Sequence, residues 1–411
     1  MITPPRLILS LALLASTVAA QIGGTGKDGA FMPTANVTLH TTGNGGQFHY
    51  TKILIPKGVT VTLRGKNPAV MPCQGAVDIA GVLDASGEIK GSSVPTFPHY
   101  TATAVPGPGG HHGGTNGNPG TGPGAGLRGP LQPAVPPAIG PSVKGGSAAH
   151  ATAPASYGKP HKPVYGSLFP LSFTGGSGGS SSSRQAYPHP RSWTHGNGGG
   201  GGGAVAILAD GKISISGSVL SQGSNSLAMG YVGGGNGSGG TILLRSMTEV
   251  DLQGGTLDAS TIRSGPAPIH SLGYIRIDSY ETPPKLAGTI KGVSLALTLP
   301  ALRELAGAQT GKVYQLRFAS VPGDIVAIFA ALKGTSIPLP PLGVLKLDFT
   351  SPHVQVLAKV PSTEIDPLAA VDIPIPADPK LIGVKFHFQG INYQTTAKRI
   401  RLTNNVITTI K

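Results

Sequence analysis

The sequence predicts an all-β fold: a parallel, right-handed β-helix in residues 21–299, with a long Gly/Pro-rich insertion at 91–203, followed by a small β-sandwich in residues 300–411. Two observations lead to this fold class. Segments with the same order of short apolar strands and glycine corners recur along the chain, and such repeats are typical of stacked architectures. The chain also holds 63 glycines and 38 prolines but only 12% charged residues, a composition that disfavours long helices.

The N-terminal 20 residues have the pattern of a secretory signal peptide. Arg6 precedes an apolar run at residues 7–18, and the small residues Ala19 and Ala20 then provide a cleavage site. The alternative is a membrane anchor, but a spanning helix needs about 20 apolar residues, more than this run supplies. We therefore expect a secreted, extracellular or cell-surface protein, with the bacterial periplasm as the alternative, and no integral membrane segment after signal removal.

Three segments of the predicted β-helix align with one another, at residues 69–87, 204–223 and 241–260, and residues 274–292 form a fourth, partial copy. Each copy has a short apolar strand, a polar corner, an alternating strand, a glycine and another short strand. Such strands bury their apolar side by stacking on the next copy, which predicts a solenoid. An ordinary antiparallel sandwich, which also has short strands and glycine turns, is the alternative.

Alternation within the copies predicts which side chains face the core. Gly81, Gly217 and Gly254 hold the same position in each copy, which suits a corner that needs positive φ or close packing between copies. We expect nine apolar residues to form stacked inward ladders: Val77, Ile79, Val82, Ile213, Ile215, Val219, Val250, Leu252 and Leu257.

The insertion at residues 91–203 has an unusual composition. It contains no Asp or Glu, six Lys or Arg residues and seven histidines, and its apolar residues show no period. Such a segment offers too little apolar surface to offset the conformational entropy of folding. We expect it to leave one corner of the β-helix and to be partly disordered or draped over the solenoid.

The C-terminal region has fewer glycines and a different strand pattern. Its short strands are separated by turns that contain proline and glycine, a spacing typical of a β-sandwich that folds on its own. The expected strands are residues 313–318, 325–330, 344–349, 354–358, 369–373, 381–389, 399–402 and 406–410.

The formal net charge of +14 indicates an acidic partner. Anionic polysaccharide or another cell-envelope polymer fits an exported protein. Nucleic acid does not, because the chain has no binding motif and no interleaving of aromatic and basic residues. Cys73 is the only cysteine and lies in an apolar stretch, so we expect a small buried residue rather than a nucleophile.

Residues 175–179 (GGSGG) match the nucleophile elbow of serine hydrolases, and residues 196–201 (GNGGGG) match a dinucleotide fingerprint. Both matches lie in low-complexity glycine, without the strand–turn–helix or βαβ context that either motif needs. His111 and His112 are adjacent, but a firm metal site needs three or four ligands, and no carboxylate or thiol lies nearby. We therefore expect no catalytic residues, metal site or cofactor.

The most site-like cluster joins aromatic and basic residues within the insertion. An exposed tryptophan with basic neighbours can stack on a sugar ring. The alternative is that this tryptophan anchors the insertion on the solenoid. The candidate ligand-binding residues are Tyr187, His189, Arg191, Trp193 and His195.

The alternative to a non-enzymatic protein is a β-helix polysaccharide lyase or glycoside hydrolase. Glycoside hydrolysis needs paired carboxylates on one surface. Asp84 and Asp258 hold equivalent positions in their copies, which suits hydrogen bonding at a corner instead. Carboxylates that converge in a groove of the folded protein would favour the enzyme.

Two regions resemble a family of secreted, Gly-rich parallel β-helix surface proteins found in planctomycete-like environmental bacteria. The first region comprises residues 48–62 (FHYTKILIPKGVTVT), 81–87 (GVLDASG) and 234–244 (GGNGSGGTILL). The second is the tail, with residues 375–383 (IPADPKLIG) and 402–405 (LTNN), which is similar to the C-terminal β module of those proteins. The resemblance implies export and a structural or adhesive role, and it brings no catalytic residues.

The histidines of the insertion suggest a pH-dependent interaction. With neutral histidines the segment carries a charge of +6, and with all seven protonated it carries +13. Since a free histidine titrates near pH 6.5, we expect the insertion to bind anionic polymers more strongly in mild acid. A passive, hydrated spacer is the alternative.

Overall fold

The computed structural model describes residues 22–90, 103–132, 142–154, 161–169, 171–185, 193–226, 228–229, 232–262, 271–280, 282–348, 350, 353–360, 368–394 and 398–411. The predicted signal peptide lies outside these residues. The described part of the chain is all-β, as predicted, and its helical content is one 3-10 turn, η1 (Pro379–Leu381).

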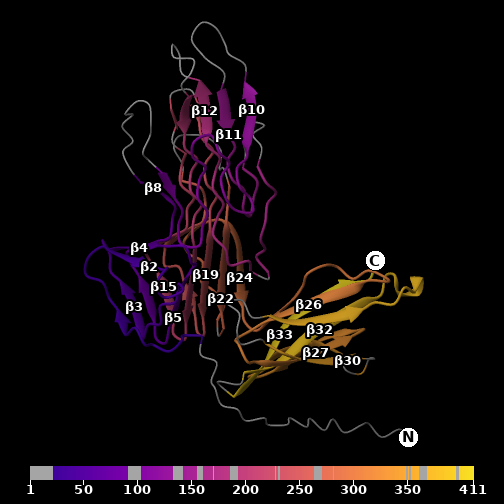
Figure 1. The fold of residues 1–411 in the computed structure, drawn as a ribbon. Coiled ribbons are helices and arrows are strands. Elements are labelled where there is room, and N and C mark those ends of the chain that lie inside the picture. The colour runs from indigo at the N-terminus through magenta and orange to yellow at the C-terminus, as the bar shows by residue number, and fades with distance from the viewer. Residues whose placement is uncertain are drawn as a thin grey trace, which may run out of the picture.

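Three parallel sheets, which we call A, B and C, form the first part of the chain (Figure 1). Sheet A has the order β1 (Ala30–Phe31), β3 (Lys52–Ile55), β6 (Val77–Ile79), β15 (Ile213–Ile215) and β20 (Val250–Asp251). Sheet B has the order β2 (Val37–His40), β4 (Thr60–Arg64), β7 (Val82–Asp84), β16 (Ser218–Leu220), β21 (Thr256–Asp258) and β23 (Thr289–Lys291). Sheet C has the order β24 (Val293–Thr298), β22 (Tyr274–Ser279), β19 (Thr241–Ser246), β14 (Ala204–Ala209) and β5 (Ala69–Cys73).

The chain visits these sheets in a repeating order. It passes from sheet C to A to B in β5, β6 and β7, again in β14, β15 and β16, and again in β19, β20 and β21. Each strand pairs in parallel with the corresponding strand of the next passage, so that Val77 lies beside Ile213 and Ile213 beside Val250. The parallel arrangement is compatible with the predicted β-helix.

The core between the three sheets contains eight of the nine predicted ladder residues, all buried. Val82 was assigned wrongly: it is only partly buried, and its neighbour Leu83 faces the core beside Val219. The strand after the corner glycine begins with an outward residue in both copies, Val82 and Ser218. The prediction placed the inward position one residue too early, and a shift of one residue changes the face of a strand.

The corner glycines stack as predicted in two copies. A Cβ on Gly217 would overlap the carbonyl oxygen of Gly81, so close packing between passages requires glycine there. In the third copy the stacked residue is Gly255 rather than Gly254, because a Cβ on Gly255 would approach the carbonyl oxygen of Ile215, whereas Gly254 has open space. Gly254 instead adopts a φ of +82°, which a glycine accommodates readily.

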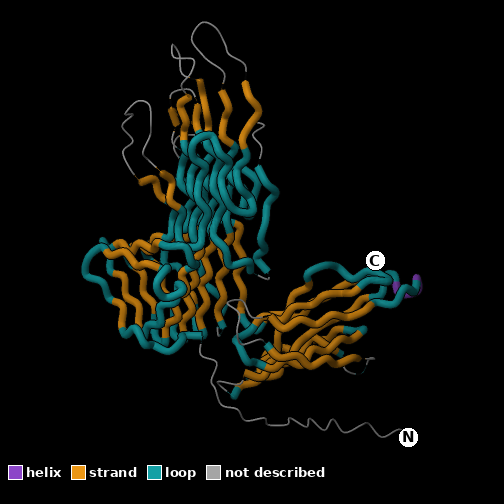
Figure 2. The backbone as a smooth tube through the Cα atoms, viewed as in Figure 1, coloured by secondary structure: helices purple, strands orange, loops and turns teal. Residues whose placement is uncertain are grey.

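Much of the insertion forms an ordered bundle that extends from the three sheets (Figure 2). We define the glycine bundle as residues 106–127, 145–150, 174–182, 197–203, 221–226 and 234–240. Its segments are extended but largely outside regular strands, and they bond to one another at every third residue. Gly176 N donates to Gly202 O at 2.7 Å and Gly179 N to Gly199 O at 2.8 Å. A period of three is that of the polyproline II conformation.

Each central segment of the bundle is bonded on several sides. Gly198 N donates to Gly114 O at 2.8 Å, whereas the next residue, Gly199, donates to Gly235 O at 2.8 Å. Glycine is needed for close approach rather than for positive φ, since a Cβ on Gly201 would overlap the carbonyl oxygen of Gly176. Backbone hydrogen bonds therefore hold this region where apolar side chains cannot.

The expectation that the insertion is partly disordered or draped is wrong for the bundle residues. The draped alternative fits a short described stretch beyond them, where Leu168 and Leu171 pack on the outer face of sheet C against Leu243 and Tyr274. The bundle also takes up residues 221–226 and 234–240, which lie outside the predicted insertion. They belong to a separate connection, between β16 and β19, whereas β14 begins at Ala204, directly after the predicted insertion.

A small antiparallel sheet lies at the end of the bundle that is distant from the three parallel sheets, and we call it the tip sheet (Figure 1). A two-stranded hairpin of β17 (Ala228–Met229) and β18 (Val232–Gly233) contacts it. The tip sheet has the order β10 (Arg128–Gln132), β11 (Ser142–Gly145), β12 (Ser182–Gln185) and β13 (Trp193–Gly196). A separate hairpin of β8 (Glu88–Lys90) and β9 (Thr103–Val105) leads from sheet B into the bundle.

The C-terminal region has two antiparallel sheets around a second core, an arrangement consistent with the predicted β-sandwich. The predicted strands at 399–402 and 406–410 are one continuous strand, and two strands near 301 and 334 were not predicted. One sheet has the order β25 (Ala301–Glu304), β26 (Val313–Ala319) and β31 (Leu368–Pro374). The other has the order β30 (His353–Lys359), β27 (Ile325–Ala331), β32 (Lys385–Gln394) and β33 (Arg399–Thr409), and a hairpin joins β28 (Gly334–Leu339) to β29 (Gly343–Leu347).

A buried polar contact connects the two regions. Asn392 of β32 donates to the hydroxyl of Tyr280 at 2.9 Å and to Asp324 at 3.0 Å, and all three residues are buried. An apolar cluster that includes Tyr280 and Val321 surrounds this contact. The proposed domain boundary at 299/300, and independent folding of residues 300–411, stay predictions, and an isolated fragment would expose this face.

Candidate functional site

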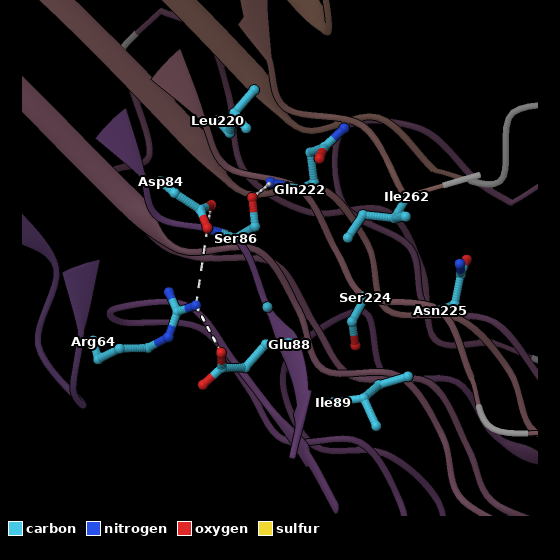
Figure 3. A pocket seen from close by; sticks show the side chains of 11 residues that line it. Arg64, Asp84, Ser86, Glu88, Ile89, Leu220, Gln222, Ser224, Asn225 and Ile262 are labelled. Atoms are coloured by element: carbon cyan, nitrogen blue, oxygen red, sulfur yellow. Dashed lines mark hydrogen bonds and ion pairs between the residues drawn. The ribbon is translucent and has the colours of Figure 1, made fainter. Parts of the chain in front are cut away.

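A cavity of about 370 Å³ opens where sheet B meets the glycine bundle (Figure 3). Its volume lies within the range of about 300–1,000 Å³ that is usual for small-molecule sites. The ends of β4, β7 and β16 contribute to its lining, together with β8 and the bundle segment 221–226. The lining residues are Arg64, Asp84, Ser86, Gly87, Glu88, Ile89, Leu220, Gln222, Ser224, Asn225 and Ile262.

The charged side chains of the cavity converge on one arginine. Arg64, at the end of β4, approaches Glu88 at 2.9 Å and Asp84 at 3.9 Å through Nη2, as Figure 3 shows. Its other terminal nitrogen, Nη1, donates to the carbonyl oxygen of Leu63 at 2.8 Å. Arg64 is nearly buried, with 9% of its side chain exposed, whereas Asp84 and Glu88 keep 24% and 30% exposed. The acidic side chains are therefore more exposed than the arginine that they face.

A chain of hydrogen bonds holds the floor of the cavity in place. Ser86 N donates to Asp84 Oδ1 at 2.9 Å, and the hydroxyl of Ser86 accepts from Gln222 N at 3.0 Å. Gln222 Nε2 in turn donates to Asp258 Oδ2 at 2.9 Å. Asp258 repeats the arrangement of Asp84 by accepting from Ser260 N at 3.0 Å. The predicted corner role of Asp84 and Asp258 is thus confirmed by these two bonds.

The cavity combines these polar groups with an apolar wall. Ile89, Leu220 and Ile262 line it beside the carboxylates and amides. A few fixed polar groups among apolar side chains are the usual composition of a ligand site. Both carboxylates lie near the Arg64 guanidinium group, Asp84 at 3.9 Å and Glu88 at 2.9 Å.

This cavity was not predicted from the sequence. Asp84 was expected only as a corner residue, and Arg64 and Gln222 were not singled out because they come from different passages of the repeat. Their proximity depends on the stacking register that places Thr62 beside Asp84 and Asp84 beside Leu220. The repeat-equivalent positions of Asp84 and Asp258 were the available signal, since they mark the edge of sheet B where the cavity lies.

The predicted aromatic and basic cluster is only partly within the described residues. Trp193 and His195 lie on β13 of the tip sheet, where they pair with Gln185 and Ser183 of β12. The other three residues, Tyr187, His189 and Arg191, lie outside the described residues. The sugar-binding cluster stays a prediction, as does the alternative that Trp193 is an anchor.

The tip sheet carries three of the six basic residues of the insertion. Arg128 lies on β10 and is exposed, Lys144 lies on β11, and Arg184 lies on β12. Backbone pairing places Arg128 opposite Gly145 and Arg184 opposite Ser142. Since residues 91–203 contain no Asp or Glu, no acidic residue of the insertion can offset these charges.

The histidines of the insertion do not share one environment. His150 is fully buried, its Nδ1 lies 2.7 Å from Gly239 O, and its ring stacks on Tyr165 with centroids 4.5 Å apart. Burial lowers the pKa of His150 to about 4. Burial and the neighbouring His112 also lower the pKa of His111. The expected charge of +13 in mild acid is therefore too high, because buried histidines resist protonation.

The remaining sequence motifs lie in structural positions. Residues 175–179 and 197–201 form part of the glycine bundle, Gly196 ends β13, and neither motif is followed by a helix in the described part of the chain. Cys73 is free and buried, as predicted, and burial raises the pKa of its thiol. A thiol that stays protonated is a poor nucleophile.

Across the ranges that the structure describes, no helix is both long and apolar enough to cross a membrane. Comparison with known proteins gives no relative: no protein-family model, no curated protein and no solved structure matches the chain.

Proposed function

We propose that the chain is a secreted, non-enzymatic protein of the bacterial cell surface or extracellular matrix, with a structural or adhesive role, and that it binds anionic polysaccharide or a similar envelope polymer. In this proposal the three parallel sheets are one right-handed β-helix, because successive passages visit sheets C, A and B in the same order. The glycine bundle is then a rigid extension of the β-helix, and the tip sheet is its binding end.

The observation that carries the proposal is the position of the basic tip sheet. The glycine bundle holds β10 to β13 away from the three parallel sheets (Figure 1), and Arg128, Lys144 and Arg184 lie on three of these strands. A group of basic residues attracts polyanions over a distance set by ionic strength, about 8 Å in physiological salt. A stalk that presents such a surface suits attachment to a polymer.

The experiment compares binding of the full chain to polygalacturonate before and after neutralising the tip. The Arg128→Ala/Lys144→Ala/Arg184→Ala variant should bind about tenfold more weakly in low salt, and moderate salt should reduce the difference. The matched control removes three exposed lysines of the C-terminal region, in Lys333→Ala/Lys380→Ala/Lys385→Ala. Equal weakening in both variants would attribute binding to overall charge and would contradict a role for the tip.

A second candidate is a β-helix polysaccharide lyase or glycoside hydrolase, and one observation favours it: Asp84 and Glu88 converge in the cavity. Against it, both carboxylates face Arg64, whereas a glycosidase directs both at the glycosidic bond. Release of reducing sugar from polygalacturonate or from neutral polysaccharides, lost in Glu88→Gln, would support the enzyme. Unaltered polymer after prolonged incubation supports the adhesive protein.

A further inference from the structure

The cavity at the junction of sheet B and the glycine bundle has a chemistry different from that of the tip sheet. We infer that it binds an uncharged, hydroxyl-rich glycosyl unit, such as one or two residues of a neutral polysaccharide. This site lies on β4, β7, β8 and the segment 220–225, and it does not depend on polyanion binding at the tip.

The charges of the described lining disfavour ionic ligands. Among the described residues that line the cavity, the charged ones are one cation, Arg64, and two anions, Asp84 and Glu88. Because Arg64 is nearly buried and paired with Glu88 at 2.9 Å, an entering anion would meet acidic side chains that are more exposed than the arginine, and it would be repelled. An entering cation would instead compete with a guanidinium group that already holds these carboxylates. A neutral ligand meets neither obstacle.

Hydrogen bonding then favours hydroxyl groups. The side chain of Asp84 is 24% exposed, and an ionised carboxylate is a strong acceptor for a hydroxyl donor. Gln222 and Asn225 line the same cavity and add amide groups, which provide both donors and acceptors. A sugar ring presents several hydroxyls that both donate and accept, so it can use this mixed set.

The apolar wall accounts for the rest of a sugar ring. Ile89, Leu220 and Ile262 offer apolar surface beside the polar groups, and the C–H face of a pyranose is apolar. Ser86 and Gln222 are held by bonds to each other and to Asp258, so the polar floor needs little reordering on binding. Preorganised groups lose less entropy when a ligand binds.

The experiment is calorimetric titration of the full chain with four disaccharides: cellobiose, mannobiose, galactobiose and digalacturonate. We expect at least one neutral disaccharide to bind with a Kd of about 1 mM or tighter. Digalacturonate should bind to the cavity about tenfold more weakly than galactobiose, because its carboxylates face Asp84 and Glu88. The tip variant serves as the background for this comparison, since it lacks the competing basic surface.

Variants of one wall residue locate the binding. Ile89 is 36% exposed, so Ile89→Trp should fill the cavity without disturbing the core and should weaken neutral disaccharide binding by about tenfold or more. Ile337→Trp, at a position 47% exposed on β28, is the matched control and should leave binding unchanged. If Ile89→Trp lowers the Tm, Ile89→Ala replaces it and should weaken binding several-fold.

Three results would overturn the inference: no neutral disaccharide binds, digalacturonate binds the tip variant more tightly than galactobiose, or the folded Ile89 variants bind as the parent does. The outcome is separable from that of the proposed function. Ile89→Trp should keep its affinity for polygalacturonate, and the tip variant should keep its affinity for the neutral disaccharide.

Discussion

Acidification should destabilise the glycine bundle through His150. The ring is buried between Tyr165, 4.5 Å away, and Tyr274, 5.0 Å away, and its Nδ1 bonds to Gly239 O, which places it against a backbone segment of the bundle. Burial holds its pKa at about 4, against 6.5 for an exposed histidine. A protonated ring at this position would carry a charge into a site where its described contacts, Tyr165, Tyr274 and the backbone of Gly239, include no carboxylate.

The sign and size of this pH effect on stability follow from the linkage between proton binding and folding. Between pH 6.5 and 4 the unfolded chain binds a proton at residue 150 that the folded chain does not, so stability is complete above pH 6.5 and falls as the pH drops toward 4. Each pKa unit corresponds to about 1.4 kcal/mol, so His150 should account for a loss of about 2.5 kcal/mol between pH 7.5 and 4.5. The lowered pKa of His111 acts in the same direction.

The assay is urea unfolding at both pH values, followed by the fluorescence of Trp193, the only tryptophan, on the tip sheet. His150→Phe keeps an aromatic ring in the stack but cannot be protonated, so it should lose about 2.5 kcal/mol less than the parent on acidification. His40→Phe, at an exposed position on β2, is the control and should behave as the parent does. An equal acid loss in the parent and His150→Phe would refute the reasoning.

Three substitutions test the packing. Ile215→Asp buries an unpaired charge in the shared core and should cost several kcal/mol, seen as a lower urea midpoint, and an unchanged midpoint would contradict the ladder. Gly201→Ala forces a Cβ against the bundle backbone and should cost about 1–3 kcal/mol, whereas Gly43→Ala, which meets open space, should have little effect on the Tm; equal Tm values would contradict close packing. Tyr280→Phe removes the hydroxyl bonded to Asn392 and should cost about 1–3 kcal/mol by urea unfolding; no loss would show that the bond adds nothing to stability.

The parallel sheets could be predicted because the pattern that specifies them lies within short stretches of the sequence. Alternation with period two and repeated glycine corners mark inward and outward residues, which is why Ile79 and Ile215 were placed correctly. The errors arose at corners, where one residue decides the face: Val82 was exchanged with Leu83, and Gly254 with Gly255. At a corner the chain turns and the alternation of apolar and polar residues starts again. The pattern therefore does not tell which face the first residues of the next strand occupy.

The glycine bundle could not be predicted from apolar patterning. The expectation of disorder rested on the small apolar surface of residues 91–203, but the bundle satisfies backbone groups directly, as in the bond from Gly176 to Gly202. The positions of the bundle segments and of the cavity also depend on contacts between passages that are far apart in the sequence. Arg64 and Gln222 come together only once the stacking register is fixed.

Amide hydrogen exchange of the full chain tests most directly whether the glycine bundle is an ordered scaffold. After correction for intrinsic rates, residues 174–182 and 197–203 should be protected to the same degree as β14 and β19 of sheet C, because their amides donate to neighbouring segments. The turn at residues 42–45, which is exposed, provides an unprotected reference in the same molecule. Exchange of the bundle segments at the rate of that turn would contradict the account.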